Sequence, residues 1–278
     1  MGVAGGDRYR EMAERTTILR APVGSTIHGL HLAGTDDRDE MGVCIEDIEG
    51  VVGFSEFEQF IYRSAAEREH RHDAPSQPGD LDLTIYSLRK FCRLALHGNP
   101  TILNLLFVPP ETCSVYTSLG GTLQEMVPLF VSRQAGKRYL GYLEAQRQRL
   151  LGERGQKKTN RPELEARFGY DTKYAMHMLR LGFQGVELLT TGGLTLPMKE
   201  PEREFLMGVR RGTVTLQECL TKCGELEREL KDLVTAADLP EQGDAARVEV
   251  WMVRVYFEMW KARAFDADIV SKLAGALR

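Results

Sequence analysis

Two short groups of residues near the start of the chain have the types and spacing needed to hold phosphate and metal. Gly24 and Ser25 follow a short apolar run, and Asp37 and Asp39 stand two apart about a dozen residues later. A glycine lets phosphate approach the backbone, and a serine hydroxyl can donate to its oxygens. Residues two apart in an extended segment point to the same face, so both carboxylates can share divalent ions.

A third carboxylate is expected from a later strand. Asp82 lies in the alternating run LDLTIY, where it would bind the metal that activates an acceptor hydroxyl or act as a general base. Asp80 is the alternative, because it lies at the start of the same strand with the same parity. Each piece alone is more typical of a solvated turn or a helix cap. The order Gly-Ser, Asp-x-Asp and then a single Asp on a later strand is far more restrictive.

Short strands must position these groups, and the apolar pattern predicts where they lie. Strands are predicted over residues 17–24, 41–46 and 81–86, with helices over 87–99 and 100–109. The stretch 51–65 is ambiguous. The Pro- and Gly-marked segment 67–80 is expected to be an exposed loop.

From about residue 122 onward the pattern is almost entirely helical. The chain therefore changes from a strand-containing front to a helical back. We expect an α+β fold, in which residues 1–115 form a small mixed β-sheet with flanking helices and residues 116–278 form a helical domain.

The residues resemble the DNA polymerase β-like nucleotidyltransferase superfamily, whose core motif is Gly-Ser followed by Asp-x-Asp and a later single Asp. The likeness extends to GSTIHGLHLAGTDDRDEMGV, to DLTIYSLRKFCRLALHGNPTILNLLF, and to GYDTKYAMHMLRLGFQGVELLTTGGLTLP with FLMGVRRG. These segments, from about Thr17 to Gly212, are similar to a branch often found in phages and associated with RNA ligase genes. The resemblance implies that residues 1–115 are a catalytic nucleotidyltransferase domain.

The resemblance also implies a role for each matching residue. Gly24 and Ser25 match the turn that binds the phosphates of the nucleotide donor. Asp37 and Asp39 match the metal-binding pair, and Asp82 matches the third carboxylate. All three carboxylates are therefore expected to be catalytic and to bind metal.

Further donor contacts are expected from basic residues on predicted helices. Lys173, His177 and Arg180 recur at helical spacing and form one polar stripe, in a segment that matches the family's second motif block. They are expected to bind the triphosphate or the base, with a solvated helix face as the alternative. Lys90, about one helical turn after the third predicted strand, has the same two interpretations. His28 stands where this branch more usually has a tyrosine, which bears on the contact with the donor.

The charge distribution bears on nucleic-acid binding. Because the formal net charge is −4, contact with nucleic acid would require a local basic patch. Between residues 133 and 161 there are nine Lys or Arg against two Glu, with Tyr139 and Tyr142 at helical spacing. A basic helix with aromatic residues can hold an RNA backbone, and a solvated face is the alternative.

Together, the residues and the resemblance predict an enzyme that depends on Mg²⁺ or Mn²⁺. It would transfer a nucleoside monophosphate from a nucleoside triphosphate such as ATP to an acceptor hydroxyl, with release of pyrophosphate. The expected acceptor is an RNA end such as that of tRNA. The alternatives are transfer to a protein or a small molecule, or an inactive module that binds nucleotide or RNA. Five scattered cysteines and no apolar run of about 18 residues favour a cytoplasmic protein without a membrane span, in the host cytoplasm if phage-encoded.

Overall fold

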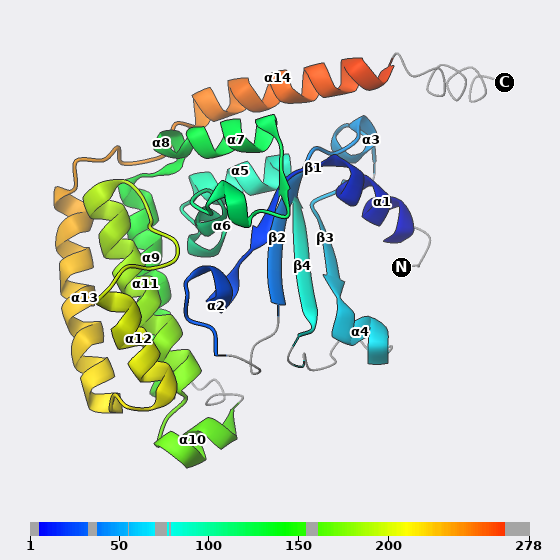
Figure 1. Ribbon diagram of the computed structural model, residues 1–278. Helices are drawn as coiled ribbons and strands as arrows, with labels where there is room; N and C mark the ends of the chain where they lie inside the picture. Colours follow the sequence, from blue (N-terminus) through cyan, green and yellow to red (C-terminus); the bar gives the residue numbers. More distant parts are fainter. Residues whose placement is uncertain are drawn as a thin grey trace.

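The computed structural model describes residues 6–32, 38–54, 56–69, 77, 79–153 and 161–264. Asp37 lies outside these residues, as does the 154–160 part of the basic stretch. Figure 1 shows a sheet on one side of the molecule, a group of long helices beside it, and one further helix crossing the top.

The sheet is mixed and has five strands in the described residues, in the order β3-β4-β2-β1-β5. β2 and β4 are parallel, and every other neighbouring pair is antiparallel. The strands are β1 (Thr17–Pro22), β2 (Arg38–Cys44), β3 (Gln59–Arg63), β4 (Leu81–Ser87) and β5 (Val115–Tyr116). The predicted small mixed sheet is therefore confirmed.

The observed elements differ from the prediction at the start of β2, at β3 and at α4. β2 begins at Arg38, earlier than the predicted start at residue 41, so that Asp39 lies inside the strand. The ambiguous stretch contains β3, none of whose residues is fully buried, which explains its weak alternation. Helix α4 (Ser64–Glu69) also extends into the segment predicted as a loop.

The other regular elements of the described fold are mainly α-helices, and none is long and apolar enough to cross a membrane. Caps fix several of them: Asn99 caps α6, Asp171 caps α11, and Thr215 with Glu218 forms a capping box on α13. Besides α4, they are α1 (Gly6–Thr16), α2 (Gly24–Ile27), α3 (Ile48–Val51), α5 (Leu88–Leu96), α6 (Pro100–Leu105), α7 (Ser118–Glu125), α8 (Val127–Phe130), α9 (Arg133–Leu150), α10 (Pro162–Phe168), α11 (Thr172–Thr191), α12 (Glu202–Arg211), α13 (Leu216–Ala236) and α14 (Ala245–Ala264). The predicted helical back of the chain is confirmed.

The largest hydrophobic cluster joins one face of the sheet to the helices that cover it. Leu19 of β1, Val43 of β2, Phe91 of α5, Tyr139 of α9 and Val255 of α14 all belong to it. Burial of this apolar surface supplies most of the energy that holds the helices on the sheet. This cluster contains residues from both sides of position 115, where the sequence predicted a domain boundary. The boundary stays a prediction.

Two smaller clusters complete the core. On the other face of the sheet, Met12 and Ala13 of α1 pack against Leu83 and Ile85 of β4. The other cluster lies among α9, α11, α12 and α13, and Leu30 contributes to it from the segment that follows α2. The chain just after Gly24-Ser25 is therefore anchored in the helical layer.

Candidate active site

Asp39 and Asp82 lie level with each other on neighbouring strands. β2 and β4 run parallel, and in their register Asp39 is paired with Asp82. Paired residues of parallel strands direct their side chains to the same face of the sheet. Sequence spacing predicted only that Asp82 would come from a nearby strand, and strand pairing brings the two carboxylates together.

The face of the sheet that carries the two carboxylates follows from strand parity. Asp39 shares parity with Met41 and Val43, and Asp82 shares parity with Tyr86; these three apolar residues belong to the largest cluster or pack against it. Asp39 and Asp82 therefore lie on the same face of the sheet as the largest apolar cluster. They form its polar edge, at the N-terminal ends of β2 and β4. Figure 1 shows these ends at the lower side of the sheet, near α2.

Gly24 lies directly against Asp39. The β1 strand ends at Pro22, the Val23 N–H donates to the Asp39 carbonyl over 2.8 Å, and Gly24 then turns with a φ of +67° into α2. A Cβ at position 24 would overlap Asp39 Oδ2 and lie 3.3 Å from Asp39 Cβ. Glycine is required here both for the left-handed backbone and for the close approach of the carboxylate.

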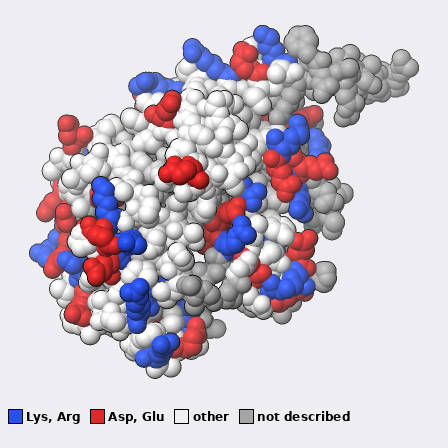
Figure 2. Space-filling model, viewed as in Figure 1, with Lys and Arg blue, Asp and Glu red and all other residues white. Residues whose placement is uncertain are grey.

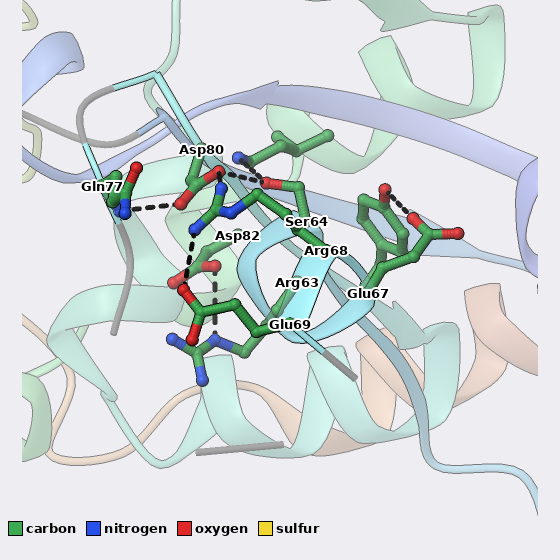
Figure 3. Close-up of polar contacts among 10 residues, drawn as sticks. Arg63, Ser64, Glu67, Arg68, Glu69, Gln77, Asp80 and Asp82 are labelled. Atoms are coloured by element: carbon green, nitrogen blue, oxygen red, sulfur yellow. Dashed lines mark hydrogen bonds and ion pairs between the residues drawn. The ribbon is translucent and has the colours of Figure 1, made fainter. Parts of the chain in front are cut away.

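Arg63 completes the row of charged groups across the sheet. It stands opposite Asp82 in the antiparallel pair of β3 and β4, and its Nε lies 3.3 Å from Asp82 Oδ1. Figure 3 shows the two side chains pointing toward each other. Both are partly exposed, which leaves the pair accessible to a ligand.

Asp80, the alternative third carboxylate, is held in a different environment. Its side chain accepts hydrogen bonds from Arg68, Ser64 and the Gln77 N–H, as Figure 3 shows. Arg68, the Gln77 N–H and Ser64 lower the pKa of Asp80 to about 2. Asp80 therefore organises the start of β4, and Asp82 is the carboxylate that lies beside Asp39.

The donor set suits a hard divalent cation, which prefers carboxylate oxygens. Asp39 and Asp82 supply such oxygens from adjacent positions. Within the described ranges, no three carboxylate, imidazole or thiol groups are gathered closely enough to hold a metal ion. Asp37, the third member of the predicted set, lies outside them. The two described carboxylates fit the predicted metal chemistry, and the full ligand set stays a prediction.

Lys90 lies at the other end of β4 from Asp82. Asp82 and Ser87 are five positions apart, which is roughly 17 Å along a strand. Lys90 follows in the first turn of α5. Its Nζ lies 2.7 Å from a carboxylate oxygen of Glu58. The structure therefore does not bring Lys90 to the two carboxylates, because the strand carries the chain away before the helix begins.

The predicted polar stripe on α11 is divided by the packing of the helical layer. Arg180 is 7% exposed, and its guanidinium contacts His28 Nε2, Gln184 Oε1 at 3.2 Å and His177 Nδ1 at 3.2 Å. Lys173, two turns earlier, instead lines a cavity beside α10. Arg180 and His177 thus hold α11 against the end of α2, because His28 is the residue that ends α2.

The buried network keeps its histidines neutral. Burial, together with the Arg180 charge, lowers the pKa of His28 well below its usual value and that of His177 to about 3. Burial also lowers the pKa of Arg180 to about 10, so the guanidinium remains charged at neutral pH. Because its partners are neutral, Arg180 places one net positive charge behind α2. A neutral His177 adds no positive charge of its own to this network at neutral pH.

The lowered pKa of His177 predicts acid sensitivity. In the unfolded chain His177 binds a proton near pH 6.5, and in the folded protein it does so only near pH 3. The free energy of unfolding is therefore highest above pH 6.5 and falls as the pH falls below that value. From pH 7 to pH 5 the free energy of unfolding should fall by about 2 kcal/mol through His177 alone. In His177→Asn, the side-chain oxygen of asparagine can replace Nδ1. Urea unfolding of this variant should show a loss of unfolding free energy from pH 7 to pH 5 that is about 2 kcal/mol smaller than in wild type. An equal loss in this variant and in wild type would contradict the prediction; exposed His97→Asn is the control.

The basic stretch of residues 133–161 is paired in part with carboxylates in its described residues. Arg147 pairs with Glu227 at 2.7 Å, Lys137 pairs with Glu241 at 3.8 Å, and Arg133 donates to a backbone carbonyl. Figure 2 shows Lys and Arg interspersed with Asp and Glu on the visible face. Tyr139, one of the two predicted aromatic contacts, is fully buried. Its burial follows from packing against α11, so it supports the fold rather than a ligand surface.

Comparison with known proteins identifies the family. Residues 7–254 match the family RlaP, which is described as the RNA repair pathway DNA polymerase beta family. The chain belongs to this family. The predicted membership of the polymerase β-like superfamily is therefore confirmed, and so is the prediction of a nucleotidyltransferase. Pol β-like nucleotidyltransferases such as the RlaP family generally use divalent metals, and the family description indicates nucleotide and RNA as partners.

One solved structure adds a weaker likeness. A nucleotidyltransferase-like protein from Exiguobacterium sibiricum is 13% identical, and the alignment covers 84% of this chain and 75% of that one with a TM-score of 0.29. No curated protein matches the chain significantly. The assignment to the RlaP family therefore rests on the family match over residues 7–254.

Proposed function

We propose that this protein uses a divalent metal to transfer a nucleoside monophosphate from a nucleoside triphosphate to a hydroxyl of RNA. The observation that carries the proposal is the close approach of Gly24 to Asp39, which is paired with Asp82 on the neighbouring parallel strand. A glycine turn of the kind that binds phosphate thus adjoins carboxylates suited to a metal. Membership of an RNA repair family motivates RNA as the acceptor.

The reaction balances with one bond formed and one broken. The acceptor oxygen attacks the α-phosphorus of the donor, and the bond from that phosphorus to the bridging oxygen breaks to release pyrophosphate. The hydroxyl proton passes to a general base, for which Asp82 is the proposed residue. Arg63, which holds Asp82 Oδ1, would position that carboxylate.

Asp37, Asp39 and Asp82 would hold the metal, with Mg²⁺ or Mn²⁺ as the proposed ion. When bound, the metal supplies charge stabilisation for the triphosphate and the attacking oxygen. Gly24 and Ser25 would place the donor's phosphates at the start of α2. The positive charge of Arg180 behind that helix adds a favourable potential for the same phosphates.

A labelling screen tests this function. Purified protein is incubated with each of the four labelled nucleoside triphosphates and a total RNA pool, with Mg²⁺, with Mn²⁺ or with a chelator. Label should enter RNA only when metal is present, and unlabelled pyrophosphate should suppress the signal. Label in a protein or in a small hydroxyl compound, with RNA unlabelled, would overturn the proposed acceptor. Nucleotide binding without transfer to any acceptor would overturn the proposed reaction.

A further inference from the structure

A basic cavity lies in the helical layer beside α10, which Figure 1 shows at the lower side of the molecule, together with the N-terminal ends of β2 and β4. It has a volume of about 490 Å³, within the range of ligand pockets. Leu32, which follows α2 in the chain, forms part of its wall and connects it with the Gly24-Ser25 turn. Its other wall residues come from α10 and its flank, the start of α11 and the end of α12, and they include Arg161, Arg167, Phe168, Lys173, Arg210 and Arg211.

Among the residues that the structure describes, the wall carries five cations and one carboxylate, Glu163. Arg161 also pairs with the buried Asp171 at 3.5 Å, and Arg167 and Arg211 have exposed side chains. The guanidinium N–H groups of one arginine can donate to two phosphate oxygens at once. The ligand that this wall suits best therefore carries phosphate groups.

Several contacts fix the backbone around the cavity. Phe168 packs so closely on Gly212 that a Cβ there would overlap its ring. The Tyr170 hydroxyl donates to the Val214 carbonyl over 2.6 Å, which ties the α10–α11 connection to the end of α12. Arg167 stacks over the Phe168 ring at 4.8 Å. Preorganisation of this kind lowers the entropy lost on binding.

We propose that this cavity binds backbone or terminal phosphate of the RNA acceptor, next to its reacting end. The inference rests on the proposed function only in taking RNA as the acceptor. The donor's triphosphate would already be neutralised by metal at the carboxylates, whereas a phosphate of the acceptor needs cations of its own. Lys173 is thereby assigned to the acceptor strand instead of the donor.

Binding measurements with a short single-stranded RNA test the proposal. Fluorescence anisotropy is recorded in a chelator without nucleotide, so the result does not depend on catalysis. Arg167→Gln and Arg211→Gln are suitable variants because both side chains are exposed, and circular dichroism checks that each variant folds. Each should weaken RNA binding about tenfold, since each removes a charged hydrogen bond to phosphate. Each should also reduce the salt dependence, by about 0.7 in the slope of log K against log salt concentration for each RNA phosphate that the variant no longer neutralises.

Controls separate this site from its alternatives. Lys137→Gln removes a cation of the basic stretch on α9 and should change RNA affinity by less than about twofold, as expected for an exposed, paired charge. ATP binding with Mg²⁺ should be unchanged in Arg167→Gln and Arg211→Gln. Weakened ATP binding with unchanged RNA binding would overturn the proposal and assign the cavity to the donor. RNA binding that depends on the cavity, in a protein that never transfers nucleotide, would support the inference and overturn the proposed function.

Discussion

Asp39→Asn is expected to lower the rate of nucleotidyl transfer by at least about 10³-fold, because a metal ligand contributes several kcal/mol to the transition state. The substitution keeps the shape of the side chain and removes its charge. Asp39 lies level with Asp82 on parallel strands and in contact with Gly24, so both metal affinity and donor placement should suffer. The measurement is single-turnover transfer of label to RNA at saturating Mg²⁺.

The matched control is Asp232→Asn, which makes the same chemical change on an exposed position of α13. It should leave transfer unchanged. Asp82→Asn should resemble Asp39→Asn, and thermal unfolding should confirm that both variants remain folded. Activity of Asp39→Asn within about tenfold of wild type, at metal concentrations where wild type is saturated, would refute a role for this carboxylate in metal binding.

Gly24→Ala is expected to lower transfer by about 100-fold, because misplacing a reacting group by about 1 Å costs that much. The added Cβ would overlap Asp39 Oδ2, and a φ of +67° is strained for alanine. Either Asp39 or the start of α2 must move, and the free energy of unfolding should also fall by about 1 to 2 kcal/mol. Transfer assays and urea unfolding measure the two effects separately.

Gly141→Ala is the matched control for that variant. Gly141 lies on an exposed position of α9, and a Cβ there would meet no atom within 4 Å. This substitution should leave transfer unchanged and raise stability by up to about 1 kcal/mol, since alanine is the better helix former. If Gly24→Ala kept full activity, the close approach at Gly24 would have no part in placing the donor.

The sequence predicted local structure well wherever one periodicity dominated. The alternation of LDLTIY predicted β4, and the pattern after residue 122 predicted the long helices. It predicted β3 poorly, because that strand buries no residue fully and so shows little alternation. The start of β2 was placed late, because its first residues, Arg38 and Asp39, are charged and do not continue the apolar pattern of the strand.

The candidate site was only partly predictable from spacing. Gly24, Asp39 and Asp82 were found because phosphate and metal binding require particular residue types. Their contact depends on β2 pairing in parallel with β4, a long-range choice that spacing does not contain. Lys90 illustrates the reverse case, since it is near Asp82 in the sequence and at the far end of the strand in space.

By itself, the sequence determined which chemistry the chain can support and the local elements that carry it, because residue type and periodicity act over a few positions. Only the tertiary structure decided which groups meet. Packing of α11 enclosed His177 and Arg180 with His28, although spacing alone made the first two an exposed stripe. The docking of α10 and α12 on α11 gathered cations from distant segments into one cavity. The physical reason is that burial and strand pairing join residues far apart in the chain, which no local pattern specifies.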